Sequence, residues 1–436
     1  MVLRKLTGYL QSHAISAEIE ERLERLHHSD EADSMLLQAR LDRLLRHATN
    51  TTPFYRGHAG ASFAEFPVVS KNQIRASMAD FMSASRPQRS WRSISTSGST
   101  GEPFRILQDR GKVRAQRADV IAFNRAAGWQ PGQRIMFLRV WQASNRLGPI
   151  QRWVGRIRPV DGADLSLAAA RSLHEMMARM REPFMLLGYG SSLDALATNL
   201  LRLGIGRTQS GIHACVAMAE PVSGFSRAVF NDVYGVKIRA RYSNAENGII
   251  AHEVPGSDGY WINEASFHVE VLRMDSDQPA DRGQTGRIVV TDLFNYAMPF
   301  IRYDTGDLGC LSESTTQGGR HRILDDIRGR RLDVLTTPEG ERISPHLIDY
   351  AVRLIPGLGR FQFEQSGQSQ YKIRVVPAGA LDIEAVRRAL EESLGSAAII
   401  AVELVDTIPQ EPSGKSPLVI NRHARPASSA RSAHTP

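Results

Sequence analysis

The residues best suited to chemistry lie together in one short stretch, residues 95–103, which reads STSGSTGEP. Its hydroxyl side chains offer donors that suit phosphate oxygens, and its glycines let the backbone turn sharply and approach a ligand closely. The residues on either side, 93–94 and 104–107, predict short strands. The loop is not a Walker A loop, which needs a lysine before its last Ser or Thr, and Glu102 stands where a cation would be wanted. The sequence predicts an anion-binding loop, with a flexible Ser/Gly hairpin as the alternative.

The composition indicates a globular protein with more than one domain. The chain has 436 residues, of which 42% are apolar, so two or three domains are expected. The longest apolar runs, such as residues 215–218, are too short to cross a bilayer, and no secretory hydrophobic region follows the N-terminus. Cys215 and Cys310 are the two cysteines, and their separation favours neither a disulfide framework nor a zinc site. We therefore expect a cytoplasmic protein that is not attached to a membrane.

The net charge of +8 would suit an anionic partner such as a nucleotide, coenzyme A or nucleic acid. The basic residues are scattered, however, and no run of five or six of them occurs. We expect an ordinary solvated surface and no nucleic-acid partner.

The middle of the chain predicts α/β layers. The region before residue 85 is charged and helical, and from residue 109 helical and strand patterns alternate. Asp109 is the predicted N-cap of a helix that runs to Ala127 and ends at Gly128, and Ser166 is the predicted cap of a helix to Arg181. Strands are predicted at 134–140, 185–187, 212–218, 237–241, 267–272 and 287–292. Ligand sites in such folds lie at the strand ends.

The last hundred residues predict a separate small domain. Residues 361–364 and 371–375 read as paired strands around a Ser366-Gly367 turn, followed by an amphipathic helix around residues 383–394 and a strand at 399–405. We expect three parts: residues 1–330, residues 331–422, and a disordered tail of residues 423–436 that is rich in Arg, Ser, Ala and Pro.

Four further polar segments appear in order along the chain: YSNAE at 242–246, RYDTGD at 302–307, RGRRLD at 328–333 and PSGK at 412–415. The second of these is expected to be a polar turn. Together with the loop, they resemble the motifs of the adenylate-forming superfamily of acyl- and aryl-CoA ligases, over roughly residues 45–420. The short chain and the TPFY opening at 52–55 look most like the phenylacetate-CoA ligase and CapK branch.

The resemblance implies a nucleotide site. The loop would hold the β- and γ-phosphates of ATP through Ser97, Gly98, Ser99, Thr100 and Gly101. Ala219, Glu220 and Pro221 would line the adenine, and Tyr242 would stack on it. Asp307 and Arg330 would bind the ribose.

The resemblance also implies a set of catalytic residues and an acid pocket. Lys415 would reach the α-phosphate and the carboxylate, and Glu246 and Thr100 would hold Mg²⁺. The acid would lie among Trp141, Tyr189, Gly190 and Met218. Some relatives carry a Cys/His zinc site after the glutamate, but the corresponding region here has no cysteine, so no zinc site is expected.

The implied fold is a large, multilayered α/β adenylation domain with a small mobile α+β domain that carries Lys415. The implied reaction joins a small-molecule carboxylic acid to ATP as an adenylate and passes the acyl group to coenzyme A. A carboxylate is already ionised near pH 7, so positioning and charge neutralisation supply the catalysis without a general base.

Two alternatives stay open. A CapK-like enzyme would pass the acyl group to an amine or hydroxyl of a sugar or metabolite. A protein that has lost the chemistry would only bind nucleotide, and three departures from the pattern of the relatives favour that interpretation: Ser243, Ala245, which has no hydroxyl for the α-phosphate, and Leu332, where relatives often have an Asp or Lys hinge.

Overall fold

The computed structural model describes residues 15–27, 31–85, 91–96, 104–141, 146–162, 165–256, 259–316, 319–330, 335–340, 342–343, 348, 351–352, 355–408 and 418–423. The predicted disordered tail lies outside these residues, apart from its first residue. No helix in this described part is both long and apolar enough to span a membrane.

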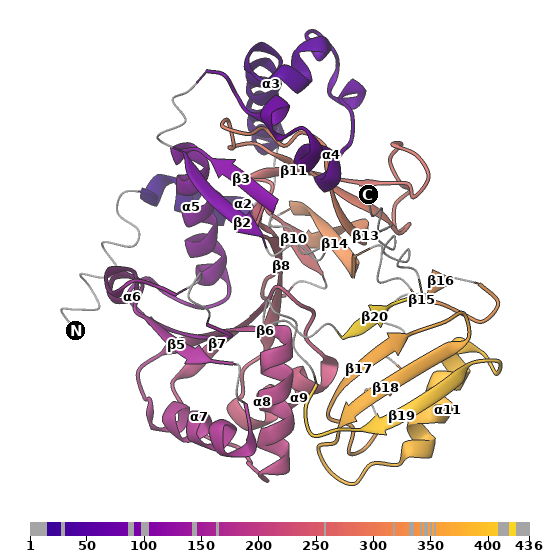
Figure 1. The fold of residues 1–436 in the computed structure, drawn as a ribbon. Coiled ribbons are helices and arrows are strands. Elements are labelled where there is room, and N and C mark those ends of the chain that lie inside the picture. The colour runs from indigo at the N-terminus through magenta and orange to yellow at the C-terminus, as the bar shows by residue number, and fades with distance from the viewer. Residues whose placement is uncertain are drawn as a thin grey trace, which may run out of the picture.

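A 12-stranded sheet forms the centre of the molecule (Figure 1). Its strand order is β11-β12-β13-β14-β10-β9-β8-β7-β6-β4-β5, with β1 paired to β13 outside this path. The parallel part runs from β5 to β8 and comprises β4 (Arg134–Arg139), β5 (Ile157–Asp161), β6 (Phe184–Tyr189), β7 (Ile212–Met218) and β8 (Ile238–Asn244). Parallel pairing with intervening helices confirms the predicted α/β class.

Helices cover both faces of the parallel strands. On one face lie α7 (Leu167–Arg179), α8 (Gly190–Arg202) and α9 (Gly224–Tyr234), and on the other lie α2 (Ser16–His27) and α5 (Arg110–Ala126). The short helix α6 (Pro149–Gly155) connects β4 to β5. Burial on both faces explains why β6 is apolar throughout.

The predicted helix boundaries follow from local capping. Asp109 caps α5 by accepting a hydrogen bond from the Lys112 amide at 3.0 Å, and Ser166 caps α7 by accepting one from Ala169. Gly128, just beyond α5, has φ +107°, a conformation that favours glycine. These contacts confirm the predicted starts of both helices.

Antiparallel strands continue the sheet beyond β8 and bend it. They are β9 (Gly248–Glu253), β10 (Tyr260–Ile262), β11 (Phe267–Leu272), β12 (Gly286–Asp292), β13 (Tyr303–Thr316) and β14 (Gly319–Arg330). Apolar side chains from five of these strands enclose a core that includes Ile250, Ile262, Val269, Val290 and Leu324. The polar turn predicted at 302–307 is wrong, because residues 303–307 belong to β13. Pairing with β12 on one side and with β14 on the other holds these residues in the strand, although their residue types favour a turn.

The N-terminal region packs on the far end of this bent sheet. It contains α3 (Glu31–Thr51), the 3₁₀ turns η2 (Pro53–His58), η3 (Phe63–Glu65) and η4 (Met78–Phe81), the strand β1 (Val69–Ser70) and α4 (Lys71–Ala76). β1 pairs with β13 in parallel, Val69 opposite Tyr303 and Ser70 opposite Asp304. The predicted strands at either side of the Ser/Gly loop form the hairpin β2 (Arg92–Thr96) and β3 (Phe104–Gln108).

The C-terminal residues form their own four-stranded sheet beside the parallel strands (Figure 1). It contains β17 (Arg360–Gln365), β18 (Gln370–Val376), β19 (Ile399–Leu404) and β20 (Val419–Asn421), and α11 (Ile383–Leu394) packs on it. The short strands β15 (Leu335–Thr336) and β16 (Arg342–Ile343) precede it. This unit confirms a small α+β domain, while its boundary at residue 330 stays a prediction.

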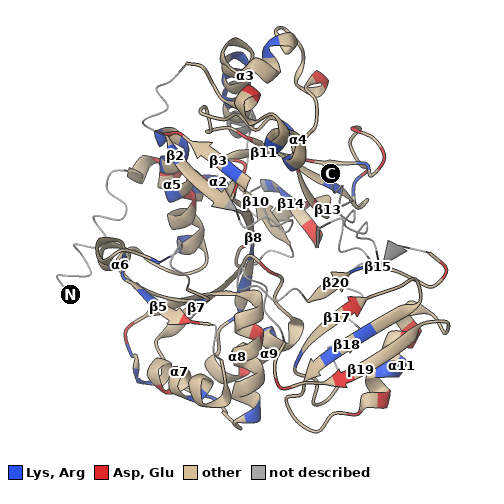
Figure 2. Ribbon diagram, viewed as in Figure 1, with Lys and Arg blue, Asp and Glu red and all other residues tan. Residues whose placement is uncertain are grey.

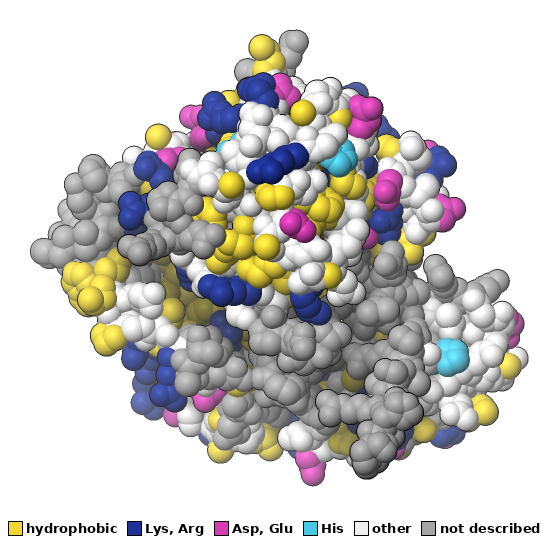
Figure 3. Space-filling model, turned by 45° about the horizontal axis from the view of Figure 1, so that its top comes forward, with side chains coloured by type: hydrophobic (Ala, Val, Ile, Leu, Met, Phe, Trp, Pro, Cys, Tyr) yellow, Lys and Arg dark blue, Asp and Glu magenta, His cyan; other side chains and the backbone are white. Residues whose placement is uncertain are grey.

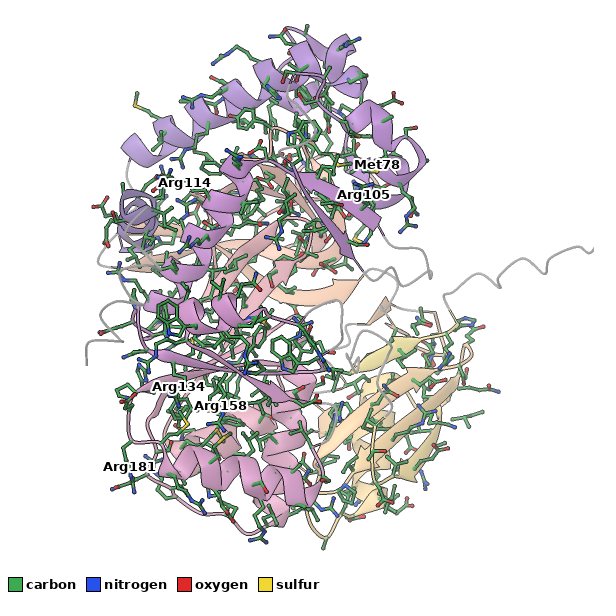
Figure 4. The ribbon with its side chains drawn as sticks, turned by 60° about the vertical axis from the view of Figure 1, so that its left-hand side comes forward. Met78, Arg105, Arg114, Arg134, Arg158 and Arg181 are labelled. Carbon is green, nitrogen blue, oxygen red and sulfur yellow. The ribbon has the colours of Figure 1, made fainter. Side chains whose placement is uncertain are left out.

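Charged residues are spread over the molecule. Acidic and basic residues alternate along the ribbon, and both signs are mixed on the surface that Figure 3 turns toward the viewer (Figures 2 and 3). Figure 4 labels five arginines from separate elements, spread along the molecule: Arg105, Arg114, Arg134, Arg158 and Arg181.

Buried ion pairs join the helical layer to the bent sheet. Arg22 of α2 pairs with Asp119 of α5, and its Nη2 donates to the Ser266 hydroxyl at 3.1 Å. Lys112 of α5 pairs with Asp292 of β12 at 2.5 Å. Because each pair is almost fully buried, loss of one partner leaves a charge without compensation.

We predict that Arg22→Met destabilises the protein by about 3–5 kcal/mol, since the Asp119 carboxylate is then buried without its cation. The double variant Arg22→Met/Asp119→Asn should recover much of this loss. Arg125→Met is the matched control, because its exposed pair with Glu20 is worth about 0–1 kcal/mol. Thermal unfolding followed by circular dichroism measures all three, and equal melting midpoints for Arg22→Met and Arg125→Met would contradict the prediction.

Candidate functional site

The carboxyl ends of the parallel strands bring most of the predicted site residues to one edge of the sheet. Trp141 follows β4, Tyr189 ends β6, Met218 ends β7 and Tyr242 lies near the end of β8. β4, β6, β7 and β8 are consecutive neighbours in the sheet. Residues widely separated in sequence therefore lie side by side, at the edge where α/β folds bind ligands.

The segment predicted to line adenine is held in a special conformation. Ala219 has φ +66°, which is uncommon for a residue with a Cβ. A Cβ on Gly190 would lie 2.0 Å from the carbonyl oxygen of Pro221, so only glycine permits this close approach. The Glu220 carboxylate accepts hydrogen bonds from the Ser191 amide at 3.0 Å and hydroxyl at 2.5 Å. Glu220 thus fixes the segment to the start of α8.

The predicted acid-pocket aromatics surround an arginine. The Arg139 guanidinium lies 5.4 Å from the Trp141 ring centroid and 5.1 Å from that of Tyr189. The Trp141 indole N–H donates to the Val160 carbonyl at 3.0 Å, which ties its ring to β5. Tyr189 is buried, and Met218 packs against the core on the α5 side of the sheet.

Tyr242 and Asp307, predicted to bind adenine and ribose, are in direct contact. The Tyr242 hydroxyl donates to Asp307 Oδ2 at 2.8 Å and lies 3.3 Å from Thr305 Oγ1. Burial and the Asp307 carboxylate hold the pKa of Tyr242 well above its usual value, so the phenol remains a donor. Asp307 faces Arg330 across β13 and β14, which places both predicted ribose residues at one point of the sheet; the Arg330 side chain lies outside what the structure describes.

Glu246 lies close by, just beyond β8, and is paired with a residue that the sequence analysis missed. The Nζ of Lys71 lies 2.9 Å from Glu246 Oε1, and the Tyr303 hydroxyl lies 3.5 Å from the same oxygen. Glu246 is 6% exposed and the Lys71 side chain is 30% exposed, so the pair is partly buried. A single lysine in the charged N-terminal region carries no motif, and only the pairing of β1 with β13 reveals its place.

Several predicted residues lie outside the described residues. They are Ser97, Gly98, Ser99, Thr100, Gly101 and Lys415. β2 and β3 locate the two ends of the loop, since Phe104 follows it directly. Within the described part of the chain no three His, Cys, Asp or Glu side chains form a metal cluster, and the absence of a zinc site stays a prediction.

Comparisons with known proteins agree with this geometry. Residues 335–422 match the CapK C-terminal domain family. The chain is 26% identical to phenylacetate-coenzyme A ligase of Thermus thermophilus over 343 residues, 74% of this chain and 75% of that protein. The structure of 2-hydroxyisobutyryl-CoA ligase in the postadenylation state, in complex with R3-HIB-AMP, superposes with a TM-score of 0.71 at 22% identity, covering 91% of both chains.

The chain has the fold of the adenylate-forming ligases. Its similarity to phenylacetate-coenzyme A ligase and to the CapK C-terminal domain supports the branch that the sequence motifs predict. The same 2-hydroxyisobutyryl-CoA ligase in its thioesterification state gives a TM-score of 0.56 at 22% identity, although 91% of this chain and 92% of that chain are again covered. This chain therefore superposes better on the first of these two structures than on the second.

The close approach at Gly190 yields a stability prediction. We expect Gly190→Ala to cost about 1–3 kcal/mol, because the added methyl group must displace the Pro221 backbone. Gly206→Ala is the control, since a Cβ there meets no atom within 4 Å. Thermal melting should separate the two variants, and an unchanged midpoint for Gly190→Ala would show that the adenine segment is not fixed by this contact.

Proposed function

We propose that this protein activates a small-molecule carboxylic acid with ATP and passes the acyl group to coenzyme A. The acid's carboxylate attacks the α-phosphorus, the bond to the β-phosphate bridging oxygen breaks, and pyrophosphate leaves with the electron pair. The thiol of coenzyme A then displaces AMP from the acyl carbon. The likeness to a phenylacetate-coenzyme A ligase and to an acyl-AMP-bound CoA ligase supports this reaction.

The observation that carries the proposal is the meeting of Tyr242, Asp307 and Glu246 beside the strand ends. An aromatic ring, a hydroxyl acceptor and a carboxylate are the types that adenine, ribose and a metal–phosphate group require. Asp307 already accepts one hydrogen bond from Tyr242, and a carboxylate oxygen has capacity for the ribose hydroxyls as well. The backbone of the adenine segment is fixed before ligand binds, which lowers the ordering cost.

Glu246 fits the role of a magnesium ligand. Mg²⁺ in nucleotide enzymes usually takes one or two carboxylates plus substrate phosphates, so a single protein carboxylate is compatible with it. The Glu246 carboxylate is held by Lys71 and lies near Tyr303, which orients it toward the nucleotide residues. Bound Mg²⁺ would neutralise charge on the phosphates, and Thr100 would supply a second contact.

A second candidate keeps the adenylation and changes the acceptor. The match of residues 335–422 to the CapK C-terminal domain family is the observation that favours it. The acceptor would be an amine or hydroxyl of a sugar or metabolite. A silent nucleotide-binding protein is the third candidate, and the missing hydroxyl at Ala245 is the feature in its favour.

We also infer that the protein works in the cytoplasm, without a nucleic-acid partner. Both cysteines, Cys215 and Cys310, are buried free thiols, which suits a reducing compartment. On the face that Figure 3 draws, Lys and Arg side chains of the described residues are interspersed with Asp and Glu.

The function is tested by a panel of carboxylic acids with ATP and Mg²⁺. We expect at least one acid to drive ATP–pyrophosphate exchange, and coenzyme A then to consume the adenylate. If ATP–pyrophosphate exchange occurs but an amine or a sugar, and not coenzyme A, consumes the adenylate, the second candidate is correct. If the protein binds ATP but no acid drives the exchange, only the nucleotide-binding protein remains.

Lys415 separates the two half-reactions. We predict that Lys415→Ala lowers adenylation by about 10²–10³-fold, the effect of removing one donor that stabilises a transition state. Transfer from a chemically supplied acyl-adenylate should stay near the wild-type rate, because that step needs no cation at the α-phosphate. Equal loss of both steps would point to general damage to the C-terminal domain instead.

A further inference from the structure

The Ser/Gly loop lacks the cation that phosphate-binding loops usually contain. Its residues 97–103 read SGSTGEP and include Glu102 but no Lys or Arg. A polyphosphate carries several negative charges, and backbone amides with hydroxyls neutralise them only in part. A side-chain cation that assists Mg²⁺ in neutralising the leaving pyrophosphate would therefore have to come from outside residues 97–103.

Lys71 lies where such a cation is needed. Its Nζ is 5.1 Å from the centre of the Phe104 ring, and Phe104 is the first residue of β3 after the loop. The same Nζ lies 2.9 Å from Glu246 Oε1. The ammonium group thus lies close both to Phe104 and to the carboxylate proposed to hold the metal.

The position of Lys71 is fixed by the backbone rather than by its own side chain. It is the first residue of α4, which begins with a capping box. The Ser70 hydroxyl accepts a hydrogen bond from the Gln73 amide at 3.3 Å, and the Gln73 side chain accepts one from the Ser70 amide at 2.9 Å. Ser70 is also paired with Asp304 of β13. The base of the lysine is held in place, and its four-carbon stem is flexible.

Mg²⁺ on the Glu246 carboxylate would weaken the hold of that carboxylate on the Lys71 ammonium, because the two cations repel each other. Phosphate oxygens beside the metal would relieve that repulsion by accepting the ammonium.

We propose that Lys71 is the phosphate-side cation of this enzyme, held by Glu246 before the nucleotide binds and transferred to the β- and γ-phosphates when Mg²⁺ takes the carboxylate. This role rests on the proposed function and adds a residue from the N-terminal region to it. Lys71 then stabilises the charge that develops on pyrophosphate as the bond to the α-phosphorus breaks, while Lys415 would act on the α-phosphate and the carboxylate of the acid. No proton moves to or from Lys71 in this step.

The test measures binding of pyrophosphate by calorimetry, with Mg²⁺ and separately with EDTA. We expect Lys71→Met to weaken pyrophosphate binding by about 10- to 150-fold in both conditions, the effect of one charge-assisted hydrogen bond. Glu246→Gln should weaken it only with Mg²⁺. Lys71→Arg should restore part of the affinity. Lys372→Met is the control, since it breaks a similar 2.8 Å pair with Glu403 on the C-terminal sheet and should leave binding unchanged.

The double variant Lys71→Met/Glu246→Gln tests whether Lys71 contacts phosphate directly or only neutralises the charge of the Glu246 carboxylate. If Lys71 contacts phosphate, the double variant binds more weakly than Glu246→Gln alone, and the exchange rate falls further. Equal binding by these two variants, or unchanged binding by a folded Lys71→Met protein, overturns the proposal while the proposed function stands. A wild-type protein that binds neither ATP nor pyrophosphate overturns both.

Discussion

The curl of the central sheet is the constraint on which the candidate site depends. Tyr242 on β8 and Asp307 on β13 are separated by four steps of strand pairing, through β9, β10 and β14. In a flat sheet those strands would lie about 19 Å apart, at about 4.8 Å per step. The hydrogen bond of 2.8 Å between the two side chains therefore requires the sheet to fold back on itself. The buried cluster around Ile250, Val269 and Val290 fills the inside of that curl and stabilises it.

Because the sheet curls, β13 comes to serve two functions. Its first residues pair with β1, which fixes Lys71, and the same stretch presents Tyr303 and Asp307 to Glu246 and Tyr242. Buried ion pairs also tie α2 to α5 and α5 to β12. The site is therefore built from the N-terminal region, the parallel strands and the bent antiparallel strands at once.

Local patterns predicted the individual elements well and the contacts between them poorly. Asp109 and Ser166 cap helices through short-range hydrogen bonds. The strands β7 and β11 show a clear apolar pattern, so all of these elements could be predicted from the sequence. Residues 303–307 were misread as a turn, because their polarity reflects the site and their strand pairing is long-range. Lys71 was missed for the same reason: 175 residues separate it from Glu246. The resemblance of the motifs to a known family predicted which residues share a site, which the hydrophobic periodicity could not do.

The placement of the C-terminal domain is coupled to the adenine segment by charge. A Cβ on Gly359 would lie 2.8 Å from a methyl carbon of Thr198, so the domain touches α8 at this point. Beside it, burial lowers the pKa of Arg360, and the carboxylates of Asp194 and Glu220 oppose that shift. Glu220 also caps α8 and fixes the segment after β7. Under the proposed function, rotation of the domain for acyl transfer would take this cation away from Glu220 and make the field at the adenine segment more negative. That change would disfavour the negatively charged AMP at the step that releases it.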